Sequence, residues 1–169
     1  MATISWSQKD SLRVAQLLDS ALLNPERSAS FLEKVDVIEK QNLGLPAVLA
    51  DVMALKVKFE LRKGNVNGAK QLVEKAKRKF KTNEALFAVF LSLEGSVFAT
   101  ERSFQEAISS YQRALRMYDD LKMEREAAYV KNNIANVFFN LNDFESAHKY
   151  ASESFETVFK LKDTLYYPQ

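Results

Sequence analysis

The sequence predicts an all-α protein, a right-handed α-solenoid of about four antiparallel helix pairs. Four alanines, Ala29, Ala69, Ala107 and Ala147, stand 40, 38 and 40 residues apart in similar helical surroundings. A fixed period of about 20–50 residues is typical of repeat proteins, whose units bury their apolar faces only against neighbouring units. The chain also has only 4 Gly and 3 Pro in 169 residues, which favours helices because sheets need many turn residues.

Apolar residues recur at helical spacing along almost the whole chain. The expected helices are 8–23, 25–41, 46–63, 66–80, 84–100, 103–119, 124–141 and 143–161. Because the connections between them are short, consecutive helices should be antiparallel neighbours. We therefore expect a single domain over 1–169, with pairs at about 8–41, 46–80, 84–119 and 124–161.

Residues that start or stop helices set these boundaries. Pro25 and Pro46 suit the first turn of a helix, and Gly44 and Gly64 suit the residue after a helix end. Side chains that can accept a hydrogen bond from the first turn precede several segments. The expected N-caps are Asn24, Asn83, Ser103 and Asp143.

Residues 95–115 carry a family pattern. This stretch resembles the tetratricopeptide repeat, whose motif has a small residue, an aromatic three residues later, and then Ala, an aromatic and Ala in the second helix. Those positions are filled in order by Gly95, Phe98, Ala107, Tyr111 and Ala114. The small residues allow two helices to approach closely, and the aromatics fill the space to the next pair.

The following unit matches the pattern in part. It fills the first three positions with Ala135, Phe138 and Ala147. Ala151 and Ser154 stand where the second aromatic and the last alanine belong, and Tyr150, one residue early, is a substitute for the aromatic. Residues 46–80 match weakly, and around Ala29 little beyond the spacing remains.

The unit length adds to the resemblance. Units of 38–40 residues exceed the usual length of about 34, and this long form is similar to repeats of bacterial signalling proteins. The resemblance implies a non-catalytic protein- or peptide-binding scaffold, expected to be a sensory or regulatory domain excised from a longer bacterial signalling protein.

The resemblance also implies a peptide groove lined by the first helix of each pair. Its expected residues are Asp51, Lys58, Arg62, Ser92, Ser96, Thr100, Tyr129, Asn132, Asn136, Phe139 and Asn140. Asparagine suits a peptide groove because its amide both donates and accepts hydrogen bonds; simple exposure on a polar helix face is the alternative. Asn133 and Asn136 match the asparagines of the family's carboxylate clamp, but Ser92 and Ser96 leave that clamp incomplete.

Charge is unevenly distributed. Residues 51–82 hold ten Lys or Arg against three acidic residues, a local charge of +7 in a chain whose net charge is +2. We interpret this segment as a solvated helix surface. The alternatives are a nucleic-acid-binding repeat that uses residues 56–81 and a small-peptide receptor of the quorum-sensing type.

Signals for catalysis are weak. The single histidine, His148, lies in a predicted helix, and the chain lacks cysteine, a phosphate-binding glycine loop and a nucleophile elbow. We expect no enzyme activity, no cofactor and no metal. No apolar run is long enough to cross a membrane, and residues 1–6 lack the basic and apolar blocks of a signal peptide. We expect a cytoplasmic protein, with a periplasmic sensor domain as the alternative.

Aromatic residues gather near the C-terminus, and most fit a core at helical spacing. The last predicted helix nevertheless carries Phe155, Val158, Phe159 and Leu161 where a solenoid needs a polar outer surface. We expect the chain to self-associate through this last pair.

Overall fold

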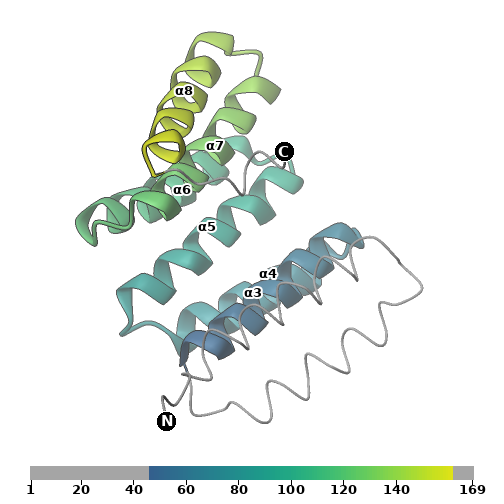
Figure 1. The fold of residues 1–169 in the computed structure, drawn as a ribbon. Coiled ribbons are helices and arrows are strands. Elements are labelled where there is room, and N and C mark those ends of the chain that lie inside the picture. Colours follow the sequence, from purple (N-terminus) through teal and green to yellow (C-terminus); the bar gives the residue numbers. More distant parts are fainter. Residues whose placement is uncertain (1–45, 162–169) are drawn as a thin grey trace, which may run out of the picture. The chain divides into compact units, whose positions relative to one another are not determined.

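The computed structural model describes residues 46–161, and within that range the chain is entirely helical (Figure 1). The helices are α3 (Pro46–Arg62), α4 (Val66–Lys79), α5 (Glu84–Thr100), α6 (Phe104–Asp120), α7 (Glu124–Asn140) and α8 (Phe144–Lys160). The chain divides into two compact units, Met1–Ala76 and Lys77–Gln169. The helices predicted at 8–23 and 25–41 lie outside the described residues.

The predicted helical repeat fold is confirmed. In the second unit α5 packs against α6 and α7 packs against α8, and α6 also packs against α7 (Figure 1). Each of the six helices begins and ends within one residue of its predicted range. Ala69, Ala107 and Ala147 are each the fourth residue of a helix, and all three are buried.

One type of turn closes four of these helices. Gly64, Arg102, Lys122 and Asn142 have φ values of 76°, 61°, 58° and 60°, in the left-handed region. After α5, the Ser103 N–H donates to the Phe98 carbonyl at 2.9 Å and the Arg102 N–H to the Ala99 carbonyl at 3.1 Å. This pair of bonds is the Schellman motif, which satisfies the last carbonyls of a helix.

The turns explain the period. α5, α6, α7 and α8 have 17 residues each, and three residues separate each from the next. Two helices with their two connections therefore make the 40-residue unit. The interval of 38 arises because α4 has only 14 residues and a four-residue connection, 80–83, follows it.

Lys122→Gly is expected to stabilise the protein by about 1 kcal/mol. A non-glycine residue in the left-handed region costs roughly 1–2 kcal/mol, and the greater conformational entropy of glycine in the unfolded chain offsets part of the gain. Urea denaturation would measure the change. Arg113→Gly, on the exposed surface of α6, is the matched control and should instead destabilise by about 1 kcal/mol. Equal losses in both variants would contradict the prediction.

Side chains cap three of the helices between residues 46 and 161. Asn83 accepts a bond from the Leu86 N–H at 3.1 Å, and Asp143 accepts one from the Ser146 N–H at 3.0 Å, as predicted. Hydrogen bonds from Ser146 also lower the pKa of Asp143 below its ordinary value. Asn65 accepts from the Gly68 N–H at 3.0 Å. Ser103 stands at the predicted N-cap position of α6, but its hydroxyl makes no capping bond.

The core of the second unit depends on a close approach of α5 to α6. A Cβ added to Gly95 would lie 2.6 Å from two ring atoms of Tyr111, so only glycine fits beneath this ring. Tyr111 is itself buried, in a cluster with Leu91, Ile134 and other apolar residues. Burial raises the pKa of its phenol.

In the next pair, α7 and α8, other residues make the contacts between the two helices. Ser154 is buried at the position where the pattern expects alanine, and its hydroxyl donates to the Ala128 carbonyl at 2.7 Å. Tyr150 stacks on Phe138 with ring centroids 5.7 Å apart, so an aromatic one residue early does pack against α7.

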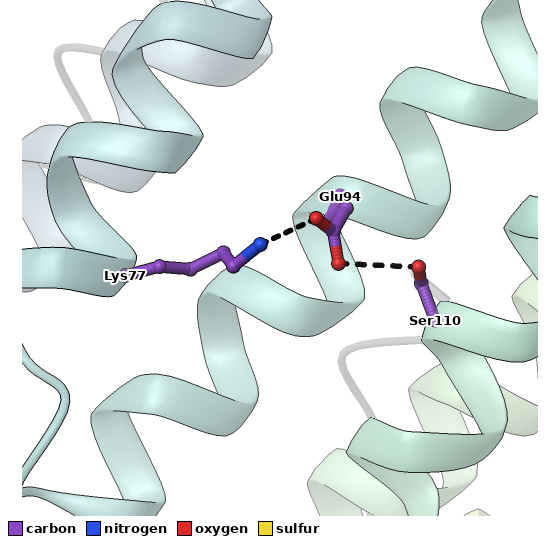
Figure 2. Close-up of polar contacts among 3 residues, drawn as sticks. All are labelled: Lys77, Glu94 and Ser110. Atoms are coloured by element: carbon purple, nitrogen blue, oxygen red, sulfur yellow. Dashed lines mark hydrogen bonds and ion pairs between the residues drawn. The ribbon is translucent and has the colours of Figure 1, made fainter.

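A polar contact joins the end of α4 to the middle of α5 and α6 (Figure 2). The Lys77 ammonium donates to one carboxylate oxygen of Glu94, and the Ser110 hydroxyl donates to the other at 3.2 Å. The side chains of Lys77 and Glu94 are only 17% and 15% exposed. Glu94 therefore accepts from two donors, the partly buried Lys77 and the buried Ser110.

Candidate functional site

A pocket of about 200 Å³ opens between the C-terminal end of α5, the turn into α6 and one face of α7. Its lining residues are Ala99, Thr100, Arg102, Phe104, Tyr111, Asn133, Asn136, Val137 and Asn140. All of them belong to the second compact unit.

α7 supplies the polar wall of the pocket. Asn133, Asn136, Val137 and Asn140 are spaced by three, four and seven residues, which places them on one face of a helix. The Asn140 amide donates to the Asn136 carbonyl at 2.7 Å. This bond orients the Asn140 side chain and leaves its amide oxygen available to a ligand.

The opposite wall comes from the end of α5. The Thr100 hydroxyl donates to the Ser96 carbonyl at 2.9 Å, so its lone pairs can accept from a ligand. Arg102 occupies the left-handed position of the turn, where the Schellman bonds fix its backbone. Arg102 is the one lining residue that carries a charge, and it makes the pocket positive.

Tyr111 lines the pocket from α6. Its hydroxyl lies 3.0 Å from the Ser96 hydroxyl, and the Ser96 hydroxyl donates to the Ser92 carbonyl at 3.3 Å. The phenol is therefore fixed by α5 and stays neutral, since burial raises its pKa.

The lining side chains can form hydrogen bonds with a ligand, but few of them are groups that take part in catalysis. Three asparagine amides, a guanidinium and two hydroxyls offer many donors and several acceptors. No lining residue is a carboxylate, histidine, lysine or cysteine, so the pocket holds no ordinary general base. Across residues 46–161, no three His, Cys, Asp or Glu side chains come together as metal ligands, and no helix is long and apolar enough to cross a membrane.

The structure brings together three of the predicted groove residues, Thr100, Asn136 and Asn140. Ser92 and Ser96 lie half-buried on α5, and only Ser96 approaches the pocket, through Tyr111. Tyr129 and Asn132 are half-buried elsewhere on α7.

The other predicted groove residues lie apart from this pocket. Phe139 is 62% exposed and contacts Phe144 edge-on, with ring centroids 5.6 Å apart. Asp51, Lys58 and Arg62 are exposed on α3, in the first unit.

Six of the nine lining residues are absent from the predicted groove set, among them Arg102 and Asn133. Arg102 was missed because the groove was assigned to first helices alone, whereas this side chain comes from a turn. Asn133 was named from the sequence only as a match to the family's carboxylate clamp, and its spacing also places it on one helix face with Asn136 and Asn140.

The basic segment is exposed for most of its length. Lys56 and Lys77 are half-buried, and the other eight cations between residues 56 and 81 are exposed. The Lys63 ammonium lies 5.3 Å from the centre of the Phe59 ring. Such exposure is what the solvated-surface interpretation requires, and nucleic-acid binding by this segment stays the alternative prediction.

Comparison with known proteins gives a fold neighbour and no family. No protein-family model matches the chain, and no curated protein matches it. Among solved structures, the chain is similar to BtubC (BKLC) from P. vanneervenii, with a TM-score of 0.55 and 21% sequence identity. The match covers 94% of this chain and 59% of that chain, so the chain corresponds to little more than half of BtubC. At this identity the likeness concerns the fold alone.

Proposed function

We propose that the chain is a non-catalytic, protein- or peptide-binding scaffold of the tetratricopeptide type, and that the pocket receives a segment of an extended peptide. The observation that carries this proposal is the convergence of Arg102 with Asn133, Asn136 and Asn140 on one small pocket. Residues without a general base among them are suited to recognition rather than to turnover.

The chemistry of the pocket selects the ligand. Peptide backbone offers a donor and an acceptor at each residue, and an asparagine amide can pair with both. Arg102 adds a charge that favours an acidic side chain or a terminal carboxylate, which a guanidinium can bind with two parallel hydrogen bonds. We therefore infer that the ligand is an extended segment with a carboxylate near the pocket.

The wider role rests on the resemblance in repeat length. We infer that the chain acts as a sensory or regulatory domain of a larger bacterial signalling protein, in which occupation of the pocket would change how the repeats pack. Attachment to a signalling module in the source organism would support this role.

A peptide library tests the binding proposal. Random-sequence decapeptides with free C-termini would be captured on the immobilised chain, and the recovered sequences resynthesised and titrated by fluorescence anisotropy. Asn136→Ala and Arg102→Gln should each weaken binding by about tenfold or more, a loss of about 1.4 kcal/mol. Asn136 is exposed, so the alanine variant should remain folded.

Asn132→Ala is the matched control, because Asn132 lies on the same helix but does not line the pocket. It should leave the affinity unchanged. Equal affinity of all three variants, or failure to recover any peptide, would overturn the proposal.

A further inference from the structure

An exposed aromatic side chain, Phe139, stands on α7 next to the pocket. Asn136 and Asn140, which precede and follow it in the sequence, both line the pocket, whereas Phe139 does not. Side chains three residues apart are neighbours on a helix surface, with Cβ atoms about 5–6 Å apart. Because Asn136 is exposed and Phe139 is 62% exposed, the polar wall of the pocket continues into an accessible apolar ring.

Phe144, the first residue of α8, holds the Phe139 ring. The ring centroids are 5.6 Å apart and the planes meet at 67°, an edge-to-face arrangement that aromatic pairs favour. The contact fixes the Phe139 ring but leaves most of it accessible. A side chain that is already held in one orientation loses little conformational entropy when a ligand covers it.

Packing between the helix pairs does not account for an aromatic at position 139. A shift of 40 residues places Ala99 of α5 at the equivalent position, so a small residue is compatible with this place in the repeat. The aromatic that packs inside the pair is the preceding residue, Phe138, which stacks on Tyr150 with ring centroids 5.7 Å apart. Phe139 is therefore an additional aromatic, placed on the surface.

An extended peptide would connect the pocket with this ring. Alternate side chains of an extended chain point to the same side and lie about 7 Å apart, which is close to the separation of positions 136 and 139 on the helix. A peptide whose carboxylate enters the pocket between Arg102 and Asn136 therefore directs the side chain two residues away toward Phe139.

We propose that Phe139, held by Phe144, is a second subsite for the peptide that occupies the pocket. It receives a large apolar side chain two residues from the carboxylate that Arg102 binds. This inference rests on the proposed function, because it requires that the pocket binds a peptide. The ligand is then a peptide that pairs a carboxylate with a large apolar residue. A buried aromatic contact beside polar ones is the usual source of affinity at such sites.

Parallel selections test the subsite. Random-sequence decapeptides with free C-termini are captured on the wild-type chain and on Phe139→Ala, which keeps its fold because the side chain is exposed. Peptides from the wild-type chain should be enriched in large apolar residues two positions from an aspartate, a glutamate or the C-terminal residue. Peptides from Phe139→Ala should keep the acidic preference and lose the apolar one.

A double-mutant cycle shows whether the two side chains meet. One recovered peptide is resynthesised with alanine at its apolar position and titrated by fluorescence anisotropy. The peptide change and Phe139→Ala should each weaken binding by about fivefold to tenfold. Together they should weaken it no more than either does alone, because both remove the same contact. The peptide change leaves the protein untouched, so its effect does not depend on folding of the variant.

Phe159→Ala is the matched control. Phe159 is another surface phenylalanine, 74% exposed, but it lies 15 residues after Phe144 on α8, about 22 Å along the helix. This variant should leave both the affinity and the apolar preference unchanged.

The possible outcomes separate the subsite from the pocket. Peptides that depend on Arg102 and Asn136 but show no apolar preference, or additive losses in the cycle, would overturn the subsite and leave the proposed function standing. Peptides that depend on Phe139 but on neither pocket residue would overturn both, as would the recovery of no peptide.

Discussion

Gly95→Val is expected to lower the free energy of unfolding by at least about 3 kcal/mol, at the upper end of the usual cost of overpacking a core. Even a Cβ alone would lie 2.6 Å from the Tyr111 ring, and this ring is buried and cannot move aside freely. Gly95→Ala should cost less, because alanine gains about 1 kcal/mol over glycine in a helix. Urea denaturation followed by circular dichroism would measure both.

A double-mutant cycle isolates the cause. In a Tyr111→Ala background the ring is gone, so Gly95→Val should add less than about 1 kcal/mol to the loss. Full additivity of the two changes would show that the ring is not what excludes a side chain at position 95. Because Tyr111 lines the pocket, Gly95→Val should also weaken any peptide that binds there.

Glu94→Ala is expected to destabilise the protein by about 2 kcal/mol. The substitution deprives Lys77 and Ser110 of a shared acceptor (Figure 2). Breaking a fully buried pair costs about 3–5 kcal/mol, and the remaining exposure of these side chains reduces that value. The same denaturation measurement applies.

The Lys131–Glu153 pair is the matched control. These atoms are 2.8 Å apart, but the side chains are 23% and 39% exposed, so Glu153→Ala should cost less than about 1 kcal/mol. A Lys77→Met, Glu94→Leu double variant should recover most of the stability lost by Glu94→Ala, since apolar side chains can replace a buried pair. If the double variant does not regain stability, the contact stabilises the fold by more than mutual neutralisation of the two charges.

Helix positions could be predicted from the sequence because their signals are local. α5 begins and ends where predicted, since Asn83 caps it and the polar run Glu101-Arg102-Ser103 follows it. The turn geometry was harder to predict from the sequence, because Arg102 and Lys122 adopt a left-handed conformation that is usually adopted by glycine. A sequence rule that predicts this turn only where glycine occurs therefore misses the turns at Arg102 and Lys122.

The pocket and the Glu94 contact could not be predicted in the same way. Glu94 stands 17 residues from Lys77 and 16 residues from Ser110 in the sequence, so nothing local indicates that they meet. Thr100, Asn136 and Asn140 were expected in the groove, but the charge that distinguishes the pocket comes from Arg102 in a turn. Such sites depend on how the helices of successive pairs pack, which is a property of the tertiary structure.

Because the helices share one length and the turns share another, helix pairs can be added to such a chain by duplication. Because two helices and two turns occupy 40 residues, a tandem duplication of residues 104–143 would add one helix pair in phase, with a turn at each junction that the chain already uses. A duplication whose ends fall inside a helix would instead leave a partial helix at the junction. Gene segments of one size are therefore the natural increments by which a protein of this design gains or loses binding sites during evolution.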